Sequence, residues 1–206
     1  MSEIALEESP DKTSAVRARR LARAISWIGH PLVFVTGSVA VIVAMRLANR
    51  VGLSVLLALL VAVVLPTILL LSRGVRSGQW SDADVSVRTE RARFYPQAML
   101  ISSFGLATLL FLDAPAFVTR GALVTLALLA VAALVNCWIK LSLHALFGFY
   151  CALILFRIHW LAGTIAFALA LLVFWSRLYL GRHGLIEMLV GAGFGLLGGV
   201  LATTWP

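Results

Sequence analysis

Charged residues are scarce in this sequence. Asp, Glu, Lys and Arg make up 13% of its 206 residues, whereas 61% are hydrophobic. A soluble domain of this length would be about a quarter charged. The low charge excludes an ordinary soluble domain and indicates a polytopic protein that folds largely in lipid. We therefore expect an integral membrane protein of a bacterial-type inner or plasma membrane, with the lipid bilayer as its first partner.

Cysteine and acidic residues are few as well. Cys137 and Cys151 show neither CxxC nor Cys/His ligand spacing, and each lies in or beside an apolar run. Buried cysteine behaves as a small hydrophobe, so we predict no structural disulfide. The chain has nine acidic residues and 17 Lys and Arg, which gives a formal net charge of +8. Membrane topology and anionic headgroups account for basic clusters between apolar runs, so no nucleic-acid partner is expected.

Apolar runs dominate the rest of the chain. A spanning helix needs roughly 20 apolar residues. We predict an all-α fold, a polytopic transmembrane helical bundle of about six to seven spans. The candidate spans are residues 31–48, 53–72, 96–112, 117–138, 142–156, 160–175 and 184–202.

The N-terminal part differs from the remainder. Residues 1–14 are polar and acidic, which predicts disorder, and no cleavable signal peptide is recognisable. Residues 15–27 carry four arginines, which favours a basic helix on the membrane surface. We divide the chain into a basic cytoplasmic segment, residues 1–27, and an integral membrane domain, residues 28–206.

Ionisable residues between the last two apolar runs form the most informative motif. It reads Ser176-Arg177, then His183, then Glu187. Ionisable residues at membrane depth mark functional sites by default. His183 and Glu187 are four residues apart, so a helix would place the carboxylate within reach of the imidazole. Histidine steered by a carboxylate beside arginines suits the handling of phosphate.

Two other polar segments accompany this motif. The loop of residues 73–95 holds three acidic residues and five arginines, and Lys140, Ser142 and His144 lie at the head of the fifth candidate span. Two spans separate the loop from Lys140, and two more separate His144 from the last motif. All three segments therefore belong on one face of the membrane.

The distribution of Lys and Arg predicts which face this is. The side of the three segments carries 13 of the 17, and the opposite side carries Arg46, Arg50, Arg120 and Arg157. Without Arg88, Arg91, Lys140 and Arg177 the split is still nine against four. The positive-inside rule then places the three segments in the cytoplasm.

The motifs together resemble the type 2 phosphatidic acid phosphatase superfamily, which includes vanadium-dependent haloperoxidases. Its third motif, S-R-x5-H-x3-D, matches Ser176 to Glu187 with Glu in place of Asp. Its second, P-S-G-H, matches Ser142 and His144 without the Pro and Gly. Its first, K-x6-R-P, is degenerate, with Arg91 as the arginine and Asp84 where the lysine would be.

The resemblance implies a membrane-embedded hydrolase of lipid phosphates or diphosphates, isoprenoid or glycerolipid, that needs neither metal nor cofactor. His183 would attack phosphorus and form a phosphohistidine, oriented by Glu187, while His144 would protonate the leaving oxygen. The implied phosphate-binding residues are Arg177, Arg91, Ser142, Lys140, Arg88 and Ser176.

Plainer interpretations stay open for several of these residues. In one interpretation, His183 and Glu187 form a hydrogen-bonded pair with a purely structural role. In another, Ser142 is the N-cap of a helix. Arg88 and Arg93 can face headgroups, and His30 and His159 can anchor span ends at the interface. Asp82 and Asp84 are expected to pair with nearby arginines rather than to bind a cation.

The last candidate span is rich in glycine. Its glycines favour close helix packing, either internal or in a homo-oligomer. A non-catalytic lipid-phosphate transporter, or a scaffold of a lipid-synthesis assembly, is the alternative function.

Overall fold

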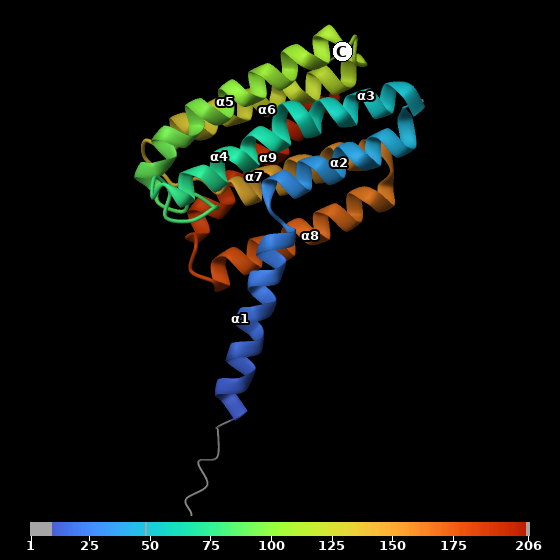
Figure 1. Cartoon of the computed structure of the whole chain (residues 1–206). Helices are drawn as coiled ribbons and strands as arrows, with labels where there is room; N and C mark the ends of the chain where they lie inside the picture. Colours follow the sequence, from blue (N-terminus) through green and yellow to red (C-terminus); the bar gives the residue numbers. More distant parts are fainter. Residues whose placement is uncertain (1–9, 48, 205–206) are drawn as a thin grey trace, which may run out of the picture.

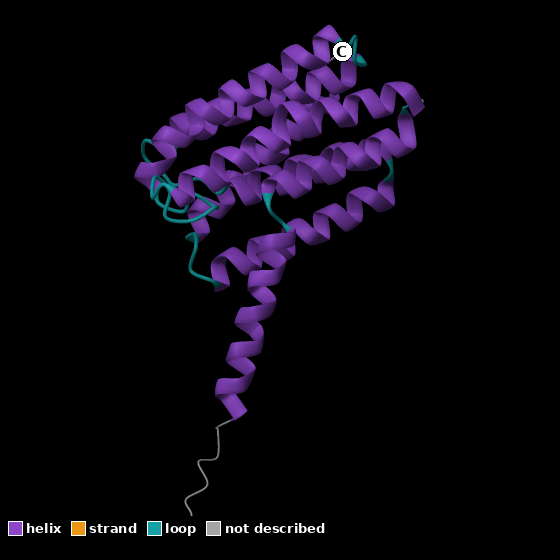
Figure 2. Ribbon diagram, viewed as in Figure 1, coloured by secondary structure: helices purple, strands orange, loops and turns teal. Residues whose placement is uncertain are grey.

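The computed structural model describes residues 10–47 and 49–204, and within them the regular secondary structure consists of helices joined by loops (Figures 1 and 2). The elements in chain order are α1 (Pro10–Ile28), α2 (Pro31–Arg46), α3 (Asn49–Leu59), the π-helix η1 (Leu60–Val64), α4 (Leu65–Arg76), α5 (Arg88–Phe111), α6 (Ala116–Val135), α7 (Leu143–Ile158), α8 (Trp160–Tyr179) and α9 (Leu185–Thr204). The all-α prediction is confirmed. Helix α1 begins at Pro10 rather than at residue 15, and residues 1–9 of the segment predicted to be disordered lie outside the described part.

Five helical segments of the described chain are long and apolar enough to cross a membrane, and a sixth is added if α1 and α2 form one span bent by 53°. The seven apolar runs are all helical, but α7 has 16 residues and is shorter than a typical span. Large apolar side chains cover the outside, such as Leu100 at 72% exposed and Phe104 at 64%. Such a surface suits lipid rather than water. The architecture is thus compatible with an integral membrane protein, and its orientation stays a prediction.

Helix α7 forms the centre of the bundle. Ten of its residues are buried, including His144, and it packs against α2, α8 and α9. A helix enclosed by its neighbours need not match the thickness of the bilayer, because it presents little surface to lipid. This position explains how so short an apolar helix belongs to a membrane bundle.

The span from Arg50 to Arg76 is interrupted at its centre. The π-turn at Leu60–Val64 precedes Pro66, which cannot donate a backbone hydrogen bond. Thr67 Oγ1 donates to Val63 O at 2.7 Å and so satisfies a carbonyl near the break. Gly105 of α5 faces Val63, where a Cβ would lie 2.3 Å from the valine Cγ2. The break therefore brings this span close to α5.

The three polar segments meet at one end of the bundle, as the topology predicted. Arg88 donates to the carbonyl oxygens of Trp138 and Cys137, and Lys140 donates to Arg182 O at 2.8 Å. Figure 1 shows the loops that follow α4 and α8 at this same end, while the first turns of α1 project away from the other helices. The folded chain thus assembles the polar residues around the start of α7.

The glycines of α9 are used mainly inside the chain. A Cβ at Gly191 would lie 2.6 Å from Ser142 O, and a Cβ at Gly195 would lie 2.3 Å from Leu146 O. Gly198 and Gly199 face Leu128 and Leu153 in the same way, whereas Gly193 is open. The buried glycines therefore let α9 approach α6 and α7, and a homo-oligomer through this helix stays a prediction.

Replacing Gly195 by Ala should destabilise the bundle, because the new Cβ would collide with the α7 backbone. Overpacking of this kind costs about 1–3 kcal/mol. Thermal unfolding of the purified protein in detergent measures the effect. The matched control is Gly193→Ala on the same helix, which should leave the midpoint unchanged or raise it. Equal midpoints for the two variants would show that α9 does not pack on α7 as described.

Candidate active site

His183 lies in the turn between α8 and α9 and is held by Glu187. Its Nδ1 is 2.8 Å from Glu187 Oε2, which also accepts a hydrogen bond from the backbone N–H of Gly184 at 3.2 Å. The expected pair is present, but His183 precedes α9 rather than lying on it, and Glu187 in the first turn reaches back. His183 is 6% exposed, and its Nε2 has no hydrogen-bond partner among the residues described. The imidazole is thus oriented by one nitrogen and unoccupied at the other.

Arg177, in the last turn of α8, is buried with 1% of its surface exposed. Its Nη1 donates to Ser26 Oγ at 2.9 Å and to Asp84 Oδ2 at 2.5 Å. Within the described part of the chain, its Nε and Nη2 have no hydrogen-bond partner. Unpaired buried donors are destabilising unless a ligand or water uses them. Arg177 therefore retains donors for an anion.

Ser142 and His144 lie at the start of α7. Ser142 caps the helix by accepting from Ala145 N at 3.4 Å, as the plainer interpretation expected, and its own N–H donates to Glu187 O at 3.3 Å. His144 is buried, and its Nε2 is 3.9 Å from Asp84 Oδ1, too long for a hydrogen bond. The second and third motifs are therefore in direct contact.

Arg91 is buried in the first turn of α5 and joins the loop before α5 to the segment before α7. Its Nε donates to Val85 O at 2.9 Å and its Nη1 to Leu141 O at 2.6 Å. Two of its donors thus hold backbone in place. The charge of Arg91 still acts on His183 and His144, so it contributes to the potential of the site.

The remaining predicted phosphate ligands have partners of their own. Arg88 is exposed and bonds the loop before α7, which makes it a brace between α5 and α7. Ser176 Oγ donates to Val173 O at 2.8 Å within α8, and Lys140 Nζ donates to Arg182 O. Of these three, Lys140 acts on His183 electrostatically, so it belongs to the charged surroundings of the site.

The loop of residues 77–87 carries Asp84 into the site. Asp82 accepts from Ser86 Oγ at 2.6 Å and from Arg182 Nη1 at 2.9 Å. Burial alone would raise the pKa of Asp82, but these hydrogen bonds lower it below its ordinary value. Val85 is buried and has a φ of 46°, a left-handed conformation that is unfavourable for a β-branched residue. Strain next to Asp84 fits a carboxylate held where the site needs it.

Both acidic residues of this loop pair with arginines, as predicted: Asp84 with Arg177, and Asp82 with Arg182. Among the described residues, no group of three or more His, Cys, Asp or Glu side chains could hold a metal ion.

Three residues of the site were not predicted as members. Asp84 was expected to pair with an arginine but not to occupy the centre. His30 was interpreted as an interface anchor, yet its ring lies 5.6 Å from the His144 ring in an edge-to-face contact. Ser26 is contributed by α1. For Asp84, the sequence offered one signal, since it stands seven residues before Arg91, where the first family motif has its lysine. His30 and Ser26 reach the site through contacts between distant segments, which the sequence does not show.

The surroundings keep His183 neutral. Burial lowers its pKa below the ordinary value, and the positive charges of Arg91, Arg177 and Lys140 lower it further. A backbone hydrogen bond with Lys140 raises the pKa but offsets only part of this decrease. A neutral imidazole with Nδ1–H donated to Glu187 carries a lone pair on Nε2. The arrangement can therefore supply a nucleophile beside cationic donors.

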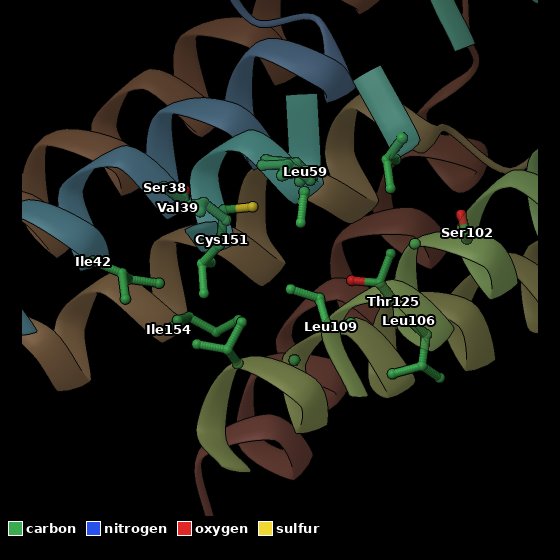
Figure 3. A pocket seen from close by; sticks show the side chains of 18 of the residues that line it. Ser38, Val39, Ile42, Leu59, Ser102, Leu106, Leu109, Thr125, Cys151 and Ile154 are labelled. Carbon is green, nitrogen blue, oxygen red and sulfur yellow. The ribbon is translucent and has the colours of Figure 1, made fainter. Parts of the chain in front are cut away.

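Apolar space adjoins the polar residues. A cavity of about 100 Å³ has His30, Asp84 and His144 in its wall, together with apolar side chains. A second apolar cavity of about 130 Å³ lies deeper, between α2, α3, α5, α6 and α7, with Ile42, Leu109 and Ile154 around it (Figure 3). The two share the wall residues Val35, Val63, Ser102 and Thr125, so together they follow the bundle away from the site.

His183 should not titrate between about pH 5 and 8, the range in which an unperturbed histidine changes charge. Because the pKa of His183 is lowered, the imidazole is neutral throughout this range, and acidification from pH 8 to pH 5 should not protonate it. NMR of histidine-labelled protein, with His183→Gln to assign the signal, tests this. A titration midpoint near 6.5 would contradict the electrostatic description of the site.

Comparisons of the chain with models of known protein families, with curated proteins and with solved structures gave no match. The resemblance to the type 2 phosphatidic acid phosphatases therefore depends on the motif residues of this sequence, and the function must be argued from the geometry of the site.

Proposed function

We propose that this protein hydrolyses a phosphate or diphosphate group of a membrane lipid through a phosphohistidine at His183. The observation that carries the proposal is a set of buried, polar atoms with no partner in the described part of the chain: His183 Nε2, His144 Nε2, and Nε and Nη2 of Arg177. They lie close enough for their charges to act on one another. A tetrahedral anion is the ligand that such a combination of donors and nucleophile suits.

The first step is an in-line displacement at phosphorus. The Nε2 lone pair of His183 forms the N–P bond as the bond from phosphorus to the leaving oxygen breaks. Glu187 accepts the Nδ1–H hydrogen bond, which fixes the tautomer and stabilises the imidazolium that develops. Arg177 neutralises charge on the equatorial oxygens, with Arg91 and Lys140 adding positive potential.

In the proposed mechanism, His144 acts as the general acid. It protonates the leaving oxygen in the first step and then takes a proton from the water that attacks the phosphohistidine, so inorganic phosphate is released and both histidines return to their starting state. A well-placed general acid contributes about 10²–10⁴-fold to the rate. Asp84 Oδ1 lies 3.9 Å from His144 Nε2, so a carboxylate adjoins the proposed acid.

The lipid nature of the substrate is supported by where the site lies. The polar residues gather at one end of the bundle. One apolar cavity has His144 and Asp84 in its wall, and the second adjoins the first through shared wall residues. A hydrocarbon chain seated there would leave its phosphate beside the histidines. The cytoplasmic location of this end follows from the Lys and Arg distribution alone.

The direct test is phosphate release from a panel of isoprenoid and glycerolipid phosphates in detergent. His183→Ala should reduce turnover by at least about 10³-fold, since it removes the nucleophile. His159→Ala is the matched control, because His159 lies at the opposite end of the bundle. Turnover that survives His183→Ala would exclude the phosphohistidine.

One observation favours the non-catalytic alternative. Asp84 already occupies Nη1 of Arg177, so the substrate must compete with an internal carboxylate. A transporter or scaffold that binds a lipid phosphate without chemistry would tolerate this pairing. In an enzyme, the incoming phosphate has to share Arg177 with Asp84 or displace it.

Asp84→Asn tests whether the phosphate competes with Asp84 for Arg177. Removing the negative charge should lower KM, or Kd for a lipid phosphate in the His183→Ala background, by roughly tenfold, because repulsion of the phosphate is relieved. The rate constant kcat falls if Asp84 also supports His144. Asp113→Asn, the same charge change at the opposite end, is the control. A KM unaffected by Asp84→Asn would show that phosphate does not bind at Arg177.

A further inference from the structure

A polar cavity lies between α1 and α8, on the side of Arg177 that faces the N-terminal helix. Its volume is about 390 Å³, larger than that of either apolar cavity. The residues that matter for its chemistry are Arg19, Arg23 and Ser26 of α1, Arg177 of α8, Arg182 and Asp84. Arg177 and Asp84 also belong to the candidate active site, but none of the family motifs includes a residue from α1, so the arginines that α1 adds to this cavity are not explained by the proposed hydrolysis.

The charge of the cavity is strongly positive. Four guanidinium groups line it against one carboxylate, that of Asp84. Arg182 shares its charge with Asp82, which is outside the cavity wall. Arg177, almost wholly buried, keeps Nε and Nη2 without a partner in the described region. Both observations point to an anion with several oxygen acceptors.

Helix α1 turns one side, which carries arginines, toward this cavity. Arg19, Arg23 and Ser26 are spaced by four and three residues and so lie on one side of the helix. Ser26 accepts from Arg177, and a Cβ at Gly29 would lie 2.0 Å from Val173 Cγ2, so α1 closely approaches α8. Arg17 and Arg20, also exposed on α1, do not line the cavity. The docking of α1 therefore selects two of its arginines for the cavity.

We infer that this cavity is a second anion site, in which the arginines of α1 bind a phosphate group on the α1 side of Arg177. Arginine recognises phosphate through paired N–H donors, and four arginines exceed what one carboxylate can neutralise. Trp27 is part of the wall and 73% exposed, and Leu21 and Ile28 of the same helix are exposed too. Exposed aromatic and aliphatic side chains beside arginines are typical of a membrane interface, where phosphate is carried by lipid headgroups.

The experiment measures binding to the full chain in detergent, in the His183→Ala background so that no probe is consumed. The probes are short-chain phosphatidate and inorganic phosphate, with short-chain phosphatidylcholine as the zwitterionic comparison. Arg19→Gln with Arg23→Gln should weaken phosphatidate binding at one site about tenfold, by loss of charge-assisted hydrogen bonds. Arg17→Gln with Arg20→Gln, which removes the same charge from the same helix, should leave it within about twofold.

The outcomes separate the sources of the ligand. Binding of phosphatidate without binding of inorganic phosphate identifies a lipid headgroup as the ligand. If Arg19→Gln with Arg23→Gln weakens the binding of inorganic phosphate equally, the site takes free phosphate. Either result supports an anion site. Equal weakening by the two double variants would overturn the inference, since it would reveal diffuse attraction to a basic helix. Phosphatidate binding unaffected by Arg19→Gln with Arg23→Gln would overturn it as well. Because α1 supplies no predicted catalytic residue, the result is independent of turnover.

Discussion

The structure depends on the burial of one positive charge, that of Arg177. A guanidinium that is 99% shielded from solvent at the end of a membrane helix is strongly destabilising unless it is paired. Asp84 supplies the balancing charge and Ser26 an acceptor, so a loop and the N-terminal helix are both tied to α8 through Nη1. The strained backbone at Val85 and the ladder of hydrogen bonds around Asp82 are consistent with a loop fixed to deliver that carboxylate.

Arg177 is the residue shared by the two functions proposed for the polar end of the bundle. Toward the start of α7, Arg177 belongs with His183, Glu187 and His144, where phosphoryl transfer is proposed. Toward α1 it belongs with the basic cavity, where binding without chemistry is proposed. Asp84 lines both this cavity and the apolar one at His144, so it separates the two regions.

Much of the fold was predictable because composition and apolar run length directly reflect the lipid solvent. The seven apolar runs are helices, and the even spacing of polar segments placed them together. The sequence could not show that α7 is short because it is enclosed, since burial depends on neighbours. Within the site, local spacing predicted the contact of His183 with Glu187. The roles of Arg88 as a brace and of Asp84 as a counter-ion arise from contacts between distant segments, which single-sequence patterns do not contain.

The chemistry proposed for His183 rests on a neutral imidazole with one nitrogen fixed and the other unoccupied. Rapid quenching of the protein during reaction with a lipid phosphate that carries a labelled phosphoryl group tests this most directly. We expect the label on His183, in an acid-labile bond that survives alkali, with no labelled protein from His183→Ala. Hydrolysis that proceeds at full rate while His183 stays unlabelled would contradict the phosphohistidine mechanism.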